Sequence, residues 1–161
     1  MRIPTLAKTA AATGAAALAG SIGSSASSPW YRSLDKPRWQ PPPAAFPLVW
    51  TTLYALIALA GARAVDRLSG LQRSGFTRRY AADLALNAAW TPLFFRVRRP
   101  RLALAEIAAL NVANLALLTR AWRADRVAGI MLLPYVAWTG FATALNASIA
   151  ARNLDGRPAA G

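Results

Sequence analysis

Cysteine and histidine are both missing from this 161-residue chain. Without cysteine there is no disulfide, no thiolate nucleophile and no cysteine-bound metal. Without histidine, the usual zinc sites, the Ser-His and Cys-His nucleophile pairs and the common axial ligands of haem iron are excluded as well. We therefore expect no metal site and no obligatory cofactor.

Acidic residues are scarce, with 6 Asp and Glu against 19 Lys and Arg, which leaves a formal net charge of +13. That balance can indicate nucleic-acid binding, but the basic residues are not gathered on a helix-turn-helix or an aromatic platform. They fall in clusters at 63–79, 96–101 and 120–126, between apolar segments. We expect no nucleic-acid partner, and we expect contact with the anionic headgroups of a lipid bilayer.

Hydrophobic residues make up 55% of the chain, and no charged residue occurs in 9–31, 39–62 or 127–151. Each of these stretches holds the ~20 residues that cross a bilayer core. Two weaker spans, 80–95 and 102–119, carry Asp83 and Glu106 near their starts. The pattern predicts an all-α, multi-pass membrane protein, with one domain over 1–161 and five transmembrane helices at about 5–25, 45–66, 81–96, 101–122 and 128–152.

Three details of this plan rest on local sequence. The first span also has the composition of a secretory signal peptide, but its spread of Ala and Gly favours a retained, closely packed helix. Segments 69–75 and 98–101 are expected to end helices. Asp83 and Glu106 are expected to have structural roles, because a carboxylate near a helix start is favoured by the helix dipole and both lie within reach of loop arginines.

The segment 29–44 is rich in proline and is predicted to be a loop. Its aromatic residues Trp30, Tyr31 and Trp39 fit two interpretations. They can form an aromatic belt at the membrane interface, or they can belong to a lid over a binding site.

Three predicted helices carry aromatic faces, because residues three or four apart share one side of a helix. The groups are Trp50 with Tyr54, then Asn87, Trp90 and Phe94, then Trp138, Ala142 and Leu145. Packing between helices is enough to account for any one of these tryptophans taken alone. Together, however, the indole N–H groups and the Asn87 amide favour a shared cavity, lined by flat apolar surfaces with a few polar groups.

Four motifs resemble the tryptophan-rich sensory protein, or translocator protein, family, which includes the peripheral benzodiazepine receptor. They are W-Y-x-x-L-x-K-P-x-W-x-P-P at 30–42, F-P-x-V-W-x-x-L-Y at 46–54, N-x-x-W-x-x-L-F-F at 87–95 and P-Y-x-A-W-x-x-F-A-x-x-L-N at 134–146. The resemblance implies a five-helix bundle, usually a homodimer, with a pocket for porphyrins and benzodiazepine-site ligands under the first loop. It implies lid residues Trp30, Tyr31 and Trp39, and pocket residues Trp50, Tyr54, Asn87, Trp90, Trp138, Ala142 and Leu145; Phe94 joins them through its helix face.

Several functions follow from this resemblance as hypotheses. The first is a receptor or sensor for a free-base porphyrin such as protoporphyrin IX, since the chain lacks the His and Cys ligands that haem iron favours. The second is light-dependent porphyrin breakdown, with Trp50 and Trp138 as the photochemical candidates, because no residues indicate catalysis in the dark. The third is transport of porphyrin or another small hydrophobic solute.

One departure from the resemblance concerns sterols. Vertebrate members end their last helix with a cholesterol motif that contains tyrosine, but 145–152 reads LNASIAAR. We therefore do not expect sterol transport. The high Ala and Arg content suggests a bacterial source, and the membrane and its orientation do not follow from the sequence.

Overall fold

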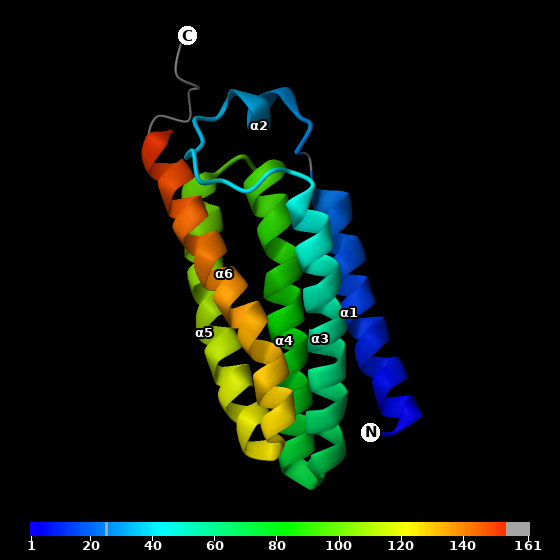
Figure 1. Cartoon of the computed structure of the whole chain (residues 1–161). Coiled ribbons are helices and arrows are strands. Elements are labelled where there is room, and N and C mark those ends of the chain that lie inside the picture. Colours follow the sequence, from blue (N-terminus) through cyan, green and yellow to red (C-terminus); the bar gives the residue numbers. More distant parts are fainter. Residues whose placement is uncertain (25, 154–161) are drawn as a thin grey trace.

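The computed structural model describes residues 1–24 and 26–153, and over those residues it contains six helices and no strand. The five long helices run side by side in one bundle (Figure 1). They are α1 (Ile3–Gly23), α3 (Ala45–Arg67), α4 (Gly70–Phe95), α5 (Pro100–Ala124) and α6 (Arg126–Arg152). The short helix α2 (Pro29–Ser33) lies in the segment that crosses one end of the bundle.

Three of these helices, α3, α5 and α6, are long and apolar enough to cross a membrane. α1 and α4 contain 21 and 26 residues. At 1.5 Å per residue they extend over about 31 and 39 Å, comparable with a bilayer core of ~30 Å. They are less apolar because α1 is rich in Ala, Thr and Gly and because α4 carries arginines in its first turns.

Helix packing follows a simple order around the bundle. α1 packs against α3 and α4, α4 packs against α5, and α6 packs against α5 and α3. Small residues permit the closest approaches: a Cβ atom on Gly61 would lie 2.7 Å from the ring of Tyr80, and one on Gly23 would lie 3.0 Å from Pro92. The buried Tyr80 hydroxyl lies 2.7 Å from that of Thr13, which joins α4 to α1.

The start of α4 differs from the prediction. The helix begins at Gly70 instead of near 81, so the segment 69–75 starts a helix and Arg73 lies within it. The reason is a pair of aromatic residues one turn apart: Phe76 and Tyr80 are 3% and 5% exposed. Burying both rings on one face stabilises the helix well before its apolar part begins.

The longer α4 also corrects the expectation for the two acids. Asp83 lies in the middle of α4, far from the helix start, and is fully buried. Its carboxylate accepts a hydrogen bond from Tyr135 at 3.2 Å. Neither Asp83 nor Glu106 forms an ion pair with any arginine in the described residues. The predicted contact with loop arginines is therefore wrong.

The segment between α1 and α3 is attached to the end of α6. Asn153 accepts a hydrogen bond from the Asp35 backbone N–H at 3.1 Å and donates to the Asp35 carbonyl at 3.0 Å. Lys36 donates to the carbonyls of Tyr31, Arg32 and Leu34 at 2.7, 3.3 and 3.0 Å. These contacts hold the segment across the bundle end as a lid (Figure 1); from here on, "the lid" means residues 26–44.

Candidate functional site

A cavity of about 580 Å³ lies under the lid. Its volume is within the ~300–1,000 Å³ that is usual for small-molecule pockets. All five long helices contribute to its walls, and no charged side chain among the described residues lines it. The lining residues are Ala17, Gly20, Ser21, Ser24, Ala26, Tyr31, Pro43, Phe46, Pro47, Trp50, Thr51, Tyr54, Asn87, Trp90, Thr91, Phe95, Ile107, Leu110, Thr139 and Ala142.

Aromatic rings form much of this wall. Trp50 and Tyr54, one turn apart on α3, stack with their centroids 5.2 Å apart. From α4, Trp90 lies at 6.2 Å and 89° to Phe95, and Phe95 lies 5.2 Å from Tyr31 of the lid. Offset and edge-on contacts of this kind fix the orientation of each ring. The cavity therefore presents firm, flat apolar surfaces.

Hydrogen bonds behind the wall hold its polar groups. The Tyr54 hydroxyl donates to Asn87 Oδ1 at 2.9 Å, and Asn87 Nδ2 donates to the Tyr135 hydroxyl at 3.2 Å. The Trp90 indole N–H donates to Asn146 Oδ1 at 3.0 Å. A buried polar group with such partners avoids the cost of desolvation without a hydrogen bond. The wall thus carries a few fixed polar positions on an apolar surface.

Six of the predicted site residues line this cavity. Tyr31 reaches it from the lid, Trp50 and Tyr54 from α3, Asn87 and Trp90 from α4, and Ala142 from α6. The structure therefore brings together residues from four separate parts of the chain that the spacing and the resemblance had grouped. Whether each one contacts a ligand stays a prediction.

Five other predicted residues do not line the cavity. Trp30, Phe94 and Leu145 belong to a packed cluster beside it. Trp138 lies behind the wall, with its ring 5.9 Å from that of Phe46. Trp39 is 49% exposed and packs edge-on against Phe141 at 5.7 Å. These side chains support or cover the wall in this structure.

The sequence reasoning missed several lining residues. Phe46 and Phe95 stand inside the quoted motifs and were not singled out. Gly20 of α1 was read only as a packing residue, yet a Cβ atom there would lie 3.6 Å from the Thr91 side chain and 3.9 Å from the Tyr54 hydroxyl. Its small size therefore leaves room beside the wall. A small residue on α1 gives no sequence signal for this role.

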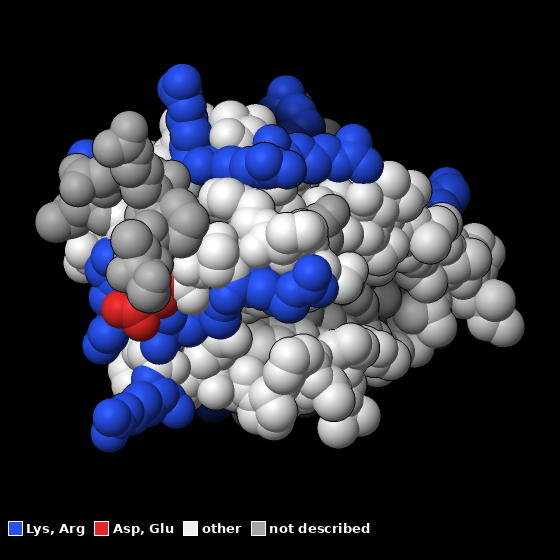
Figure 2. Space-filling model, turned by 90° about the horizontal axis from the view of Figure 1, so that it is seen from above, with Lys and Arg blue, Asp and Glu red and all other residues white. Residues whose placement is uncertain are grey.

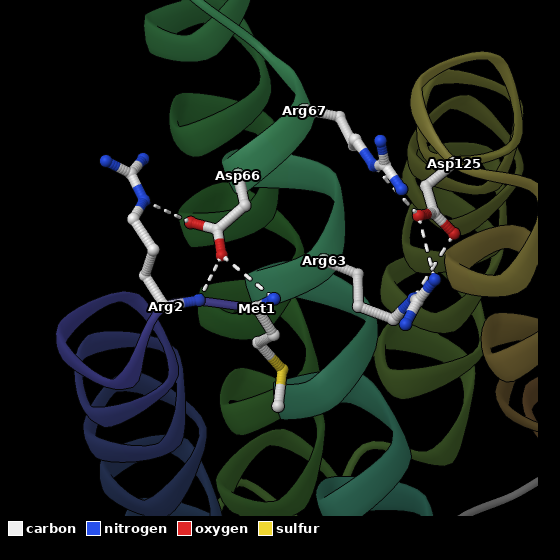
Figure 3. Close-up of a pocket in the computed structure, with 6 residues that line it drawn as sticks. All are labelled: Met1, Arg2, Arg63, Asp66, Arg67 and Asp125. Carbon is white, nitrogen blue, oxygen red and sulfur yellow. Dashed lines mark hydrogen bonds and ion pairs between the residues drawn. The ribbon is translucent and has the colours of Figure 1, made fainter.

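A second cavity, of about 290 Å³, lies at the opposite end of the bundle and is lined almost wholly by charged residues. Figure 3 shows Arg63 and Arg67 pointing at Asp125, and Arg2 beside Asp66. Arg63 donates to both Asp125 oxygens at 3.2 and 3.0 Å, and Arg67 lies 3.5 Å from the same carboxylate. The arginines and aspartates here satisfy one another, so this cavity is a structural contact between helices.

Asp125 lies between α5 and α6 and also caps α6, accepting a hydrogen bond from the Ala128 N–H at 2.9 Å. Burial raises the pKa of this carboxyl, but the hydrogen bonds from Ala128 and Arg63 outweigh burial and lower the pKa overall. The ionised form is therefore stabilised by folding. Asp125 joins α3 to the start of α6.

Comparison with known proteins agrees with the architecture. The model of the TspO/MBR family matches residues 8–152, which is most of the chain. The chain belongs to the TspO/MBR family. The match covers most of α1, the lid and all of the other four long helices.

Similar proteins occur in bacteria, a fungus and mammals. The chain is 40% identical over 117 residues to the tryptophan-rich sensory protein of Cereibacter sphaeroides, covering 73% of this chain and 72% of the relative. It is 35% identical over 149 residues to protein CrtK of Rhodobacter capsulatus, with 89% and 91% covered. It is 34% identical over 119 residues to the human translocator protein, with 73% and 70% covered. With its three apolar helices, this TspO/MBR family member is an integral membrane protein.

Proposed function

We propose that this protein is a membrane receptor or sensor whose cavity binds a flat, largely apolar ligand of the porphyrin type. The observation that carries the proposal is the uncharged aromatic cavity of about 580 Å³ under the lid. A flat molecule can stack on the ring faces of Trp50, Tyr54, Trp90 and Phe95. Haem iron is usually held by His or Cys, and the chain has neither. A free-base porphyrin such as protoporphyrin IX therefore suits the cavity better than haem.

The proposal includes five membrane crossings, by α1, α3, α4, α5 and α6. The five helices are parallel or antiparallel neighbours of similar extent (Figure 1), and clusters of arginine lie at both ends. Because the chain lacks cysteine, single cysteines at the exposed Ser69 and Val97, on either side of α4, can be labelled with a membrane-impermeant maleimide in oriented vesicles. The two sites should react from opposite sides. Reaction of both from the same side would show that α4 does not cross and would reject the five crossings.

Binding is tested by titrating protein in an uncharged detergent with protoporphyrin IX in the dark, following tryptophan fluorescence and porphyrin absorbance. Trp50→Ala removes a ring from the wall and should weaken saturable binding about tenfold or more, as loss of a stacked aromatic contact of ~1–3 kcal/mol implies. Trp122→Ala is the matched control, because Trp122 lies at the end of α5 outside the cavity. Quenching that does not saturate, or that is equal in both variants, would reject the proposal.

The position of Trp50 favours a second candidate function, light-dependent breakdown of the bound porphyrin by oxygen. Trp50 lines the cavity, whereas Trp138 lies behind Phe46. Illumination of the complex should therefore degrade porphyrin in the wild type and in Trp138→Phe, and much less in Trp50→Phe. Equal breakdown in all three proteins, or in free porphyrin, would remove this candidate.

A further inference from the structure

The cavity wall contains no charged residue among those described, yet the lid end of the molecule is strongly basic. Seen from that end, Lys and Arg form several separate patches on a mostly uncharged surface, and only one small acidic patch is visible (Figure 2). A charge buried in the cavity would lose hydration without a partner, which costs several kcal/mol. Any charged group of a ligand must therefore lie at the cavity mouth.

Two arginines directly follow cavity residues in the sequence. Arg32 follows Tyr31 of α2, and Arg96 follows Phe95 at the end of α4. The rings of Tyr31 and Phe95 both line the cavity, and their centroids are 5.2 Å apart. Both arginines are exposed, so they stand outside the cavity next to a ring pair of its wall.

Backbone carbonyls hold both guanidinium groups at the rim. Arg96 Nη2 donates to the Ile22 carbonyl at 2.9 Å, and Arg32 Nη1 donates to the Ser27 carbonyl. Ile22 follows the lining residue Ser21, and Ser27 follows the lining residue Ala26. The two guanidinium groups therefore sit at the junction of α1 and the lid, where the exposed Ser21, Ser24 and Ala26 form the cavity edge.

Each of these guanidinium groups keeps most of its hydrogen-bonding capacity. A guanidinium carries five N–H donors, and the contacts just described use one on each arginine. Neither Arg32 nor Arg96 forms an ion pair with a carboxylate in residues 1–24 and 26–153. A planar fork of donors with no carboxylate partner is suited to bind one.

We infer that Arg32 and Arg96 form a carboxylate-binding rim, which makes this cavity prefer a flat ring with acidic side chains over the same ring without them. The ring lies among Tyr31, Trp50 and Phe95, and its carboxylates reach outward to the two arginines. The inference rests on the proposed function and narrows it to acidic ligands. Protoporphyrin IX, which carries one propionate on each of two neighbouring pyrrole rings, has this form, whereas its dimethyl ester has the same ring without the charges.

The test titrates both compounds into the wild type, Arg32→Gln, Arg96→Gln and the double variant in an uncharged detergent. Each replacement should weaken binding of the diacid about fivefold, the upper range for a partly exposed charge pair, and the double variant should weaken it about 25-fold if the two contacts are independent. Binding of the dimethyl ester should change less than about twofold in every variant, because the ester offers no carboxylate to pair.

Arg101→Gln is the matched control. Arg101 lies in the first turn of α5 at the same end of the molecule, is exposed and does not line the cavity. Arg101→Gln removes the same unit of charge as Arg96→Gln. If both variants weakened binding of the diacid equally, the effect would be one of general surface charge, and the inferred carboxylate-binding rim would be wrong. Equal loss of diacid and ester binding would overturn it too. Failure of both compounds to bind the wild type saturably would instead reject the proposed function itself.

Discussion

At the end of the bundle away from the lid, arginine and aspartate are paired with each other. Arg63 forms two hydrogen bonds with Asp125, whose side chain is only 6% exposed (Figure 3). At the lid end, Arg32 and Arg96 are held by backbone carbonyls. A carbonyl positions a guanidinium but does not neutralise it. Arginines therefore close the far end in ion pairs, whereas at the lid end Arg152 pairs with Asp35 at 3.3 Å but Arg32 and Arg96 remain able to receive an anion.

The two ends also differ in how closely their helices pack. Away from the lid, α5 and α6 meet so closely that a Cβ atom on Gly129 would lie 2.9 Å from the Cα atom of Trp122. Under the lid, the helices diverge around a cavity of about 580 Å³. A closely packed, ion-paired end can anchor the bundle while the lid end retains space. Substitutions at three positions test this difference between the two ends.

The largest effect is expected at Gly129, where alanine has no room. Trp122 is close through its backbone as well as its ring, so the clash cannot be relieved by rotating a side chain. Gly129→Ala should destabilise the protein by roughly 1–3 kcal/mol, as overpacking does. The measurement is the thermal unfolding midpoint in detergent.

Gly140→Ala on the same helix is the control for Gly129→Ala. Nothing lies within 4 Å of a Cβ atom at Gly140, and alanine favours a helix by about 1 kcal/mol over glycine. Gly140→Ala should therefore raise or maintain the unfolding midpoint. Equal midpoints for the two variants would contradict the close packing of this end.

A smaller effect is expected at Asp125, and two replacements separate its roles. Asn also caps helices, so Asp125→Asn removes the charge and keeps the cap, whereas Asp125→Ala removes both. Asp125→Asn should cost about 0.5–1 kcal/mol, because its arginine partners are partly exposed, and Asp125→Ala should cost about 1 kcal/mol more. The unfolding midpoints should fall in that order. An unchanged midpoint for Asp125→Asn would show that the ion pairs do not hold this end.

The pH dependence of Asp125 has a definite sign. Its pKa is lowered in the folded protein, so its contribution is fully present above the unfolded-state value of about 3.9 and is lost as pH falls through the folded-state pKa. The difference in midpoint between wild type and Asp125→Asn should shrink below about pH 4. A constant difference down to strongly acid pH would contradict the contribution of the charge.

The ends of a helix could be predicted from the sequence where charged residues or proline bound its apolar run. α3, α5 and α6 lie within a few residues of their predicted ranges, because their ends coincide with arginine or proline. α4 begins earlier than predicted because Phe76 and Tyr80 bury an otherwise polar first half. That burial depends on Thr13 and Gly61 in other helices, which no local pattern reveals.

The cavity residues show the same limit on what can be predicted from sequence. Helical spacing grouped Trp50 with Tyr54 and Asn87 with Trp90, and both pairs line the cavity, but spacing does not say how each helix is rotated about its axis. On α6 the rotation places Thr139 and Ala142 at the cavity and Trp138 behind Phe46. On α3 it places Trp50 and Tyr54 at the cavity. Rotation is set by packing between helices, so the sequence predicts the face and the structure selects its members.

The smallest effect on overall stability is expected at Lys36, which holds the lid. Its ammonium donates to three carbonyls at the end of α2 and lies 4.8 Å from the centre of the Tyr31 ring. Lys36→Ala should loosen the lid and speed ligand release. The unfolding midpoint should change by less than the equivalent of about 1 kcal/mol, because polar contacts within a partly exposed surface segment contribute little to global unfolding.

Hydrogen exchange resolved along the chain is the measurement for Lys36→Ala. Amides in 29–36 should exchange faster than in the wild type, and those of α5 and α6 should be unchanged. Arg38→Ala is the control, since Arg38 is an exposed lid residue. If Lys36→Ala lowered the unfolding midpoint as far as Gly129→Ala, the lid would contribute to global stability as much as the closely packed end does. The proposed difference between the two ends would then be wrong. Faster exchange confined to the lid would show instead that the cover opens independently of the bundle beneath it.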